Sequence, residues 1–158
     1  TALQKSQGGS GILLGGAAGM APARVLILGA GVAGSNAAEV AVGMQADVTI
    51  VDRTQKNRER ARADLGQSLQ TAAPDQIAEL APQADLIVGA ALAAGAKAPK
   101  LITRDMLRSM RPGSVLVDIS IDQGGCFATS RPTTLADDTR FDEFVGLPGC
   151  ISRGDRLG

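Results

Sequence analysis

Histidine, tryptophan and tyrosine are absent from this chain of 158 residues, and phenylalanine occurs only three times. Without histidine the chain has no imidazole base, no imidazole proton shuttle and no histidine metal ligand, and we expect no metal site. Proteins that bind single-stranded nucleic acid stack the bases on aromatic side chains. The shortage of aromatic residues argues against that class of protein.

An excess of charge of one sign is also lacking, because 16 Lys and Arg balance 16 Asp and Glu. Binding to nucleic acid or to an anionic membrane needs a positive field, so we expect neither partner. The apolar stretch over 11–34 is interrupted by Pro22, Arg24 and repeated glycines, whereas a membrane span needs about 20 apolar residues. Cys126 and Cys150 are too few for a disulfide scaffold, and no signal peptide is visible. These absences predict a soluble, cytoplasmic protein.

Glycine, in contrast, is abundant, with 20 residues, nearly twice the usual share of about 7 %. The middle of the chain alternates apolar runs of strand length with helical segments. Strands are expected at 24–28, 47–51, 68–70, 85–89 and 114–119, and helices at 32–44, 54–65, 75–80 and from Thr103 to before Pro112. This alternation predicts βαβ units with a parallel sheet and helices on both faces. The expected fold is α/β, a doubly wound, Rossmann-like domain.

We expect a single domain over 1–158, because single domains usually run about 100–200 residues. The alternating pattern marks its core and dissolves toward both ends. The parts expected are a lead-in over 1–23 (the end of a helix at 1–7, then a loop with a short strand at 12–14), a Rossmann core over 24–128, and a loop and tail over 129–158.

The central motif is Gly29-Ala30-Gly31-Val32-Ala33-Gly34, a G-x-G-x-x-G between a predicted strand and a predicted helix. Asp52 ends the next strand, 52 − 29 = 23 residues later, close to the spacing of about 20 expected for a ribose-binding acid. Gly29 would permit the tight turn, Gly31 the close approach of a pyrophosphate, and Gly34 the packing of helix on strand. The pyrophosphate would meet the positive end of the helix dipole.

Asp52 can accept hydrogen bonds from both hydroxyls of the adenine ribose and would repel a 2′-phosphate. The pattern therefore favours NAD(H) over NADP(H). Two alternatives stay open from the residues alone. The glycines could form only a tight turn in an α/β protein that binds something else, and Arg53 could partner a 2′-phosphate if its guanidinium folded over the site.

Two further loops follow strands whose carboxyl ends face the same crevice. In the first, 90–100, an apolar wall for cofactor rings would be formed by Ala90, Ala91 and Leu92. Lys97 and Lys100 could contact phosphate or substrate, although a solvated role is the commoner one. In the second, Asp122 precedes two glycines and is either a site carboxylate or a turn former. Cys126 has no histidine partner and is better explained as a small buried side chain than as a nucleophile.

Four stretches resemble the NAD-binding domain of bacterial alanine dehydrogenase over about 7–134. They are QGGSGILLGG, VLILGAGVAGSNAAEVAVGM, DLIVGAALAAGAKAPKLITRDMLRSM and PGSVLVDISIDQGGCFATSRPTT. IDQGGC with TSRPTT is more diagnostic than the glycine motif. The related NAD-binding subunit of proton-translocating transhydrogenase shares GAGVAG and a stretch like APKLITRDM. That subunit usually carries a longer insertion around the third strand and differs at IDQGGC.

The resemblance implies NAD-dependent oxidative deamination of L-alanine to pyruvate and ammonia, with hydride delivered to the nicotinamide. It also implies roles for individual residues. The pyrophosphate would be held by Gly29, Gly31, Val32, Ala33 and Gly34, and the adenosine ribose by Asp52. Ala91, Leu92 and Ile119 would line the cofactor cleft, and Asp122 would be the catalytic aspartate near the nicotinamide ribose.

The chain departs from the family in what it lacks. The family's substrate domain, built from sequence before and after the NAD domain, supplies a histidine, a lysine and an arginine that bind pyruvate and transfer protons. We find no counterpart here. Near the C-terminus the family has a C-V-A-N-M-P-like segment at the nicotinamide, where this chain has FVGLPG at 144–149, and the Leu-Pro pair is nearer the transhydrogenase version.

Three functions are compatible with these residues. The chain could be the NAD(H)-binding domain of an alanine-dehydrogenase-like oxidoreductase that does not turn over alone. It could instead be a transhydrogenase-like module acting with a partner chain, or an inactive protein with the NAD fold. The first implies a small 2-oxo acid or amino acid as a further partner where a substrate domain is present, and the family implies a homo-oligomer.

Overall fold

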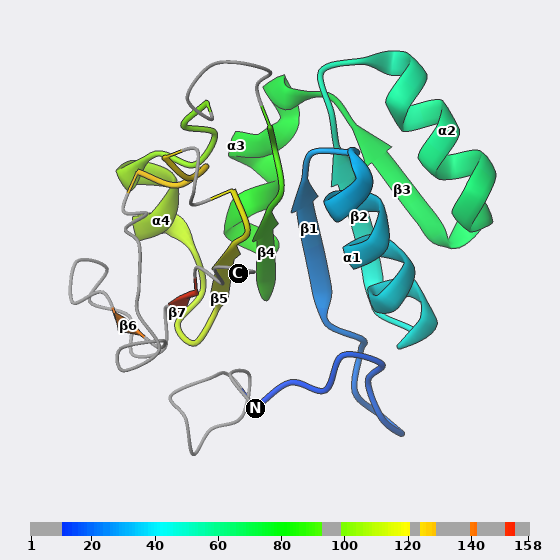
Figure 1. Cartoon of the computed structure of the whole chain (residues 1–158). Coiled ribbons are helices and arrows are strands. Elements are labelled where there is room, and N and C mark those ends of the chain that lie inside the picture. The colour runs from blue at the N-terminus through cyan, green and yellow to red at the C-terminus, as the bar shows by residue number, and fades with distance from the viewer. Residues whose placement is uncertain (1–10, 93–98, 121–123, 129–139, 142–150, 154–158) are drawn as a thin grey trace.

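The fold is taken from a computed structural model, which describes residues 11–92, 99–120, 124–128, 140–141 and 151–153. Its centre is a sheet of strands that run side by side, with helices on either side of it (Figure 1). None of the helices in the described residues has both the length and the hydropathy that a bilayer crossing requires.

The strands of the described residues join in one sheet in the order β3-β2-β1-β4-β5-β7-β6. They are β1 (Arg24–Leu28), β2 (Asp47–Val51), β3 (Leu69–Ala72), β4 (Leu86–Gly89), β5 (Val115–Asp118), β6 (Arg140–Phe141) and β7 (Ile151–Arg153). All neighbours pair in parallel except β6, which is antiparallel to β7. β1 lies between β2 and β4, with Leu26 opposite Thr49 on one side and Ile87 on the other.

Helices connect successive strands. The α-helices are α1 (Val32–Gly43), α2 (Gln55–Leu65), α3 (Ile77–Leu80) and α4 (Arg104–Ser109), and the 3₁₀ turns are η2 (Gly66–Ser68), η3 (Pro74–Gln76) and η4 (Ala81–Gln83). Pro74 begins the segment that leads into α3, as expected from its fixed φ.

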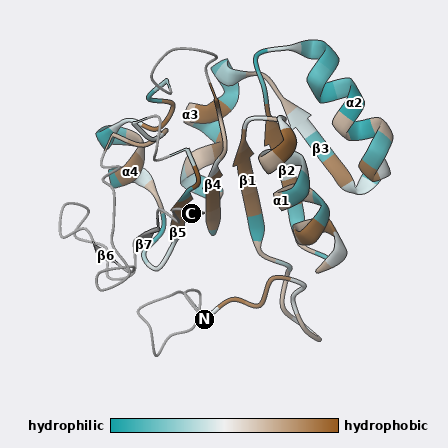
Figure 2. Ribbon diagram, in the orientation of Figure 1, coloured by the Kyte–Doolittle hydropathy of each residue, from teal (hydrophilic) through white to brown (hydrophobic). Residues whose placement is uncertain are grey.

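Two hydrophobic clusters lie on opposite faces of the sheet. Val25 and Ile27 of β1 pack in one cluster with residues of α1 and α2. Leu26 and Leu28 pack in the other with residues of α3 and α4. Because successive strand residues point to opposite faces, a strand covered on both sides must be apolar along its buried length, as β4 is and as β1 is after its exposed first residue, Arg24 (Figure 2). This arrangement confirms the doubly wound α/β prediction.

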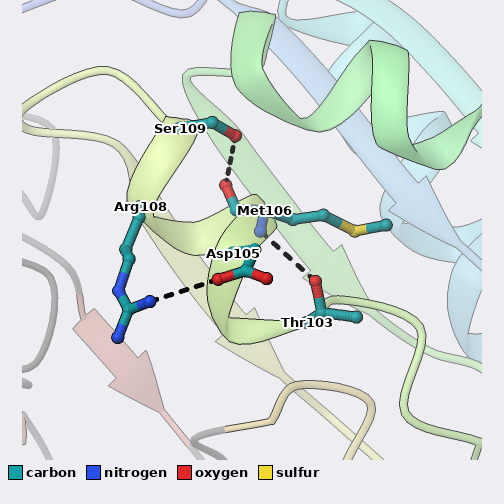
Figure 3. A network of polar contacts seen from close by, with 5 residues as sticks. All are labelled: Thr103, Asp105, Met106, Arg108 and Ser109. Carbon is teal, nitrogen blue, oxygen red and sulfur yellow. Dashed lines mark hydrogen bonds and ion pairs between the residues drawn. The ribbon is translucent and has the colours of Figure 1, made fainter.

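α4 shows how local sequence fixes a short helix. Thr103 precedes it, and its Oγ1 accepts the N–H of Met106 at 3.3 Å. Asp105 lies in the first turn and Arg108 in the last, where each charge suits the helix dipole, and their side chains form an exposed ion pair at 3.1 Å. Ser109 Oγ donates to the carbonyl of Met106 (Figure 3). The predicted start at Thr103 is confirmed.

The expected strand at 12–14 is wrong. Residues 14–15 form a turn, and Ala17 and Met20 make an isolated antiparallel bridge. Gly16 has a φ of 70°, and a Cβ there would lie 2.6 Å from the carbonyl oxygen of Met20. The glycines therefore fold this stretch back on itself. The prediction that 129–158 forms only a loop and a tail also needs correction, because β6 and β7 extend the sheet. The helix end predicted at 1–7 lies outside the described residues.

Replacement of Ile87 tests the packing of the central strand. Its side chain is fully buried in β4, so Ile87→Ala should lower the free energy of unfolding by about 2–5 kcal/mol. Urea denaturation followed by far-UV circular dichroism measures this loss. Val40→Ala, at an exposed position of α1, should change the same quantity by less than about 0.5 kcal/mol. Equal losses in the two variants would contradict the burial described.

Candidate functional site

Gly29 makes the turn between β1 and α1. Its φ is 105°, a left-handed value that glycine adopts readily because it has no Cβ. A Cβ at this position would lie 2.7 Å from the carbonyl oxygen of Ala90. Glycine is therefore needed both for the turn and for the close approach of the chain that follows β4, as the motif predicts.

Gly34 lies in the first turn of α1 and packs against Gly29. A Cβ at Gly34 would lie only 1.8 Å from the carbonyl oxygen of Gly29. No side chain can be accommodated at that distance, so α1 begins directly against the end of β1. The predicted packing of helix on strand is confirmed.

Gly31 has a different environment. It is the N-cap of α1, and no side chain caps the helix. A Cβ built on Gly31 would meet no atom within 4 Å, so the space beside it is open. The first N–H groups of a helix have no acceptor within the helix, and the dipole makes this end positive. The loop thus offers donors and room to an anion.

Asp52 immediately follows β2, and its carboxylate is directed at the glycine loop. Oδ2 accepts the N–H of Ala30 at 2.9 Å. Oδ1 accepts the N–H of Thr54 at 2.7 Å and the side-chain amide of Asn57 at 3.3 Å. The carboxylate therefore links the first loop to the start of α2, which keeps it at the edge of the sheet.

α2 contributes contacts that the sequence did not indicate. The Arg58 guanidinium donates to the backbone carbonyl of Asp52. Arg60 Nη2 donates to the carbonyl oxygen of Ala30 at 2.8 Å. Spacing from Asp52 is the one sequence signal that could have found Asn57, Arg58 and Arg60, because all three fall within the first two turns of the helix after the acid.

A cleft of about 220 Å³ opens where the chain leaves β1, β2 and β4. The sheet order places β2 and β4 on opposite sides of β1, so this is the point where the direction of strand succession reverses. Ligands of open α/β sheets bind at that point. The cleft is lined by Gly29, Gly31, Val32, Ala33, Val51, Asp52, Arg53, Thr54, Asn57, Pro74, Ala90, Ala91, Leu92, Pro99 and Leu101.

The cleft brings together most of the residues expected to bind a cofactor, including Val32 and Leu92, whose side chains are 81 % and 60 % exposed. Gly34 and Ile119 do not line it. Gly34 acts through packing, and Ile119 follows β5, where its N–H donates to the carbonyl of Gly89 at 2.8 Å. Asp122 and Lys97 lie outside the described residues.

A buried polar cluster follows β4 and β5. Asp118 Oδ1 accepts the N–H of Ser120 at 3.0 Å, and Oδ2 accepts the N–H of Cys126 at 2.7 Å. Ser120 Oγ donates to the carbonyl of Gly89 at 3.2 Å and lies 3.2 Å from Cys126 Sγ. Burial, and secondarily the nearby Asp118 carboxylate, raise the pKa of the Cys126 thiol. Cys126 is thus a buried structural side chain, as expected.

Lys100 belongs to this region rather than to the phosphate side of the cleft. Its Nζ donates to the carbonyl oxygens of Gly124 and, at 3.0 Å, Phe127. It therefore fixes the loop over 124–128. Within the described ranges, His, Cys, Asp and Glu side chains form no group of three that could ligate a metal ion.

Comparison with known proteins identifies the family. The sequence model described as "Alanine dehydrogenase/PNT, C-terminal domain" matches residues 1–149. The chain belongs to this family. It is therefore a nicotinamide-dinucleotide-binding domain of an alanine dehydrogenase-like protein.

Individual relatives agree with this family assignment. An alanine dehydrogenase from Halomonas elongata is 49 % identical, over 96 % of this chain and 43 % of its own length. A solved L-alanine dehydrogenase superposes with a TM-score of 0.86 at 37 % identity, covering 97 % of this chain and 42 % of that one. A transhydrogenase from Sinorhizobium meliloti gives 0.71 at 32 % identity, over 90 % and 40 %. The chain thus spans less than half the length of these relatives.

The two glycines Gly34 and Gly31 should respond differently to a methyl group. Gly34→Ala places a Cβ against the Gly29 carbonyl and should lower the free energy of unfolding by about 1–3 kcal/mol, as overpacking does. Gly31→Ala enters open space and should lower it by about 0.5–1 kcal/mol, the lower part of what N-cap changes to alanine cost. Urea denaturation measures both. A larger loss for Gly31→Ala would show that the turn is misdescribed.

The raised pKa of Cys126 predicts a slow thiol reaction and a pH-dependent stability. In a Cys150→Ser background, where Cys126 is the remaining cysteine, an aromatic disulfide reagent at pH 8 should react much more slowly with the folded chain than with the chain in guanidinium, because the thiolate is the nucleophile. The unfolded thiol ionises near its usual pKa of about 8.5, below the folded value.

The protonated Cys126 thiol therefore contributes fully to the free energy of unfolding below about pH 8.5. That contribution is lost as the pH rises through the pKa of the unfolded and then of the folded thiol. A Cys126→Ala variant in the same background should lack that loss. Equal reaction rates for folded and unfolded chains would contradict the burial of Cys126.

Proposed function

We propose that the dinucleotide of this domain is NAD(H) rather than NADP(H), and that it binds in the cleft beside the glycine loop. One observation carries the proposal. The open space at Gly31 and the carboxylate of Asp52 lie at the same edge of the sheet, joined by the 2.9 Å hydrogen bond from Ala30 to Asp52. The residues present fit the phosphates and the ribose of a dinucleotide at this spacing.

The pyrophosphate would lie against the backbone of the loop. Helix N-termini bind phosphate through free N–H groups and through the helix dipole. The N-terminus of α1 would offer both to a ligand in the cleft, which is lined there by Gly31, Val32 and Ala33. Gly29 and Gly34 hold the turn that aims these groups. A side chain at position 31 would fill the space that the phosphate needs. The backbone conformation of Gly31 does not require glycine, so this need for space explains why glycine is found there.

Asp52 would bind the adenine ribose and exclude a 2′-phosphate by charge repulsion. Three donors already fix its carboxylate, from Ala30, Thr54 and Asn57. The contact from Asn57 is the longest of the three, at 3.3 Å, and is the one that a ribose hydroxyl would displace most easily. Arg53 also lines the cleft and would offer a cation to NADPH, but Asp52 would oppose its phosphate.

The nicotinamide half would lie toward β4 and β5. Ala91 and Leu92 give that end of the cleft an apolar wall, and we assign Ile119 and Asp122 to the same end. When bound, NAD(H) supplies the hydride acceptor or donor. The wall excludes water from the ring, and Asp122 would accept a hydrogen bond from the nicotinamide ribose and stand near the reacting centre.

The activity proposed for the whole protein is that of the relatives named above, alanine dehydrogenases. L-alanine, NAD and water would yield pyruvate, ammonia and NADH. This chain has no histidine, so the acid–base group expected of such a reaction would come from a substrate domain. A homo-oligomer stays a prediction of the resemblance.

A transhydrogenase-like module is the second candidate, favoured by the superposition on the Sinorhizobium meliloti protein. The alanine dehydrogenase fold matches more closely, with the higher TM-score of 0.86 against 0.71. We therefore place the alanine dehydrogenase activity first.

Titration with NADH and NADPH tests the cofactor assignment. Nicotinamide fluorescence is a clean signal, because the chain has no Trp and no Tyr. The chain should bind NADH saturably and NADPH much more weakly. Asp52→Asn should weaken NADH binding roughly ten- to a hundredfold, since hydrogen bonds to a charged group contribute about 1.5–3 kcal/mol. The same variant should narrow the difference between the two cofactors.

Asp64→Asn is the matched control, because Asp64 is an exposed acid on α2, the helix that follows Asp52. It should bind both cofactors like the parent chain. Unchanged affinities for the two cofactors in Asp52→Asn would refute the ribose assignment. No binding of either cofactor by the parent chain would favour the hypothesis of an inactive protein with the NAD fold.

A further inference from the structure

The motif's second residue, Ala30, is held at both its backbone N–H and its backbone carbonyl. The Ala30 N–H donates to Asp52 Oδ2 at 2.9 Å. Its carbonyl oxygen accepts from Arg60 Nη2 at 2.8 Å and from Ser35 Oγ at 3.5 Å. Arg60 reaches this carbonyl from α2, a helix that covers the neighbouring part of the sheet, and it is not among the residues that line the cleft.

The carbonyl of Ala30 belongs to the same peptide unit as the N–H of Gly31. This peptide is trans, as are all those described, so its C=O and N–H point in opposite directions. With the carbonyl held by Arg60, the Gly31 N–H points away from Arg60. Gly31 lines the cleft, and among the described residues no acceptor takes its N–H. The guanidinium thus fixes the orientation of an unused donor.

Arg60 also affects the strength of that donor. A hydrogen bond from a charged group polarises the peptide that accepts it, and linked hydrogen bonds strengthen one another. The Gly31 N–H is therefore a better donor to an anion with Arg60 in place. A cation on the surface of α2 acts here through one peptide group and not by touching the ligand.

We propose that Arg60 is a positioning residue for the phosphates of the dinucleotide, holding the Ala30–Gly31 peptide so that the Gly31 N–H is presented to the pyrophosphate. The proposal rests on the proposed function, because it concerns the same cleft. It predicts that Arg60 matters for ligands that carry the phosphates and not for the nucleoside, which would contact Asp52 at the other end.

Binding of ADP and adenosine separates these two roles. The affinities for ADP and adenosine are measured by the displacement of NADH from the domain, which is followed through NADH fluorescence. Arg60→Met should weaken NADH and ADP by about tenfold, the effect of one charge-assisted hydrogen bond, and leave adenosine unchanged. Arg60→Lys, which keeps a charged donor, should recover part of the loss. Arg62→Met removes an exposed arginine from the last turn of the same helix and should bind all three ligands normally.

The amide resonance of Gly31 gives a measurement that needs no ligand. In a ¹⁵N-glycine-labelled chain, Arg60→Met should move the Gly31 amide proton upfield, because its peptide loses the polarising contact. The amide of Gly43, at the other end of α1, should stay in place. Arg62→Met should move neither.

Three results would overturn the proposal. Equal weakening of ADP and adenosine would mean that Arg60 supports the fold of the cleft as a whole. An unmoved Gly31 resonance would mean that the contact with Ala30 does not set the peptide. If the parent chain bound no nucleotide while the resonance moved, the contact would be real but the proposed function, and the phosphate role with it, would be refuted.

Discussion

The contact between Gly34 and the carbonyl of Gly29 determines the arrangement of the rest of the site. A Cβ at Gly34 would come within 1.8 Å of that oxygen, so α1 can start directly on the end of β1 only if the residue is glycine. The contact places the positive end of the helix over the carboxyl edge of the sheet. Because β1 is central, with β2 and β4 as neighbours, that edge is also where the two halves of the sheet diverge.

Hydrogen bonds from α2, from Thr54 and from the glycine loop determine how the charged and polar groups of the site are arranged. Asp52 stands next to the glycine loop, and donors from Ala30, Thr54 and Asn57 hold its carboxylate. Arg58 and Arg60 hold the carbonyls of Asp52 and Ala30. These hydrogen bonds hold the carboxylate and the two carbonyls where the site would bind ribose and phosphate. Under the proposed function the site would recognise the cofactor, and the groups that transfer protons to a substrate would come from another part of the protein.

The sequence predicted the parallel core for a physical reason, and most of the residues that it assigned to a cofactor line one cleft. The buried residues of β1 and β4 are apolar because helices cover both faces of the sheet. Local geometry requires glycine at Gly29 and Gly34, two positions that the motif records. Spacing from Asp52 could only have placed Asn57 and Arg60 on the next helix. Their contacts could not be predicted, since a long polar side chain on an exposed helix has many rotamers and only the folded chain selects one. The contacts of Lys100 with carbonyls of a distant loop could not be predicted for the same reason. The strand expected at 12–14 is absent for another reason, because the glycines of the turn at 14–20 fold this stretch back on itself.

A crystal structure of the domain with NADH tests the central claim most directly. The account predicts the pyrophosphate within hydrogen-bond distance of the N–H groups of Gly31, Val32 and Ala33. The adenine ribose hydroxyls should lie on the carboxylate of Asp52, with the Asn57 amide moved from Oδ1. A dinucleotide bound elsewhere, or one with its ribose away from Asp52, would contradict the account.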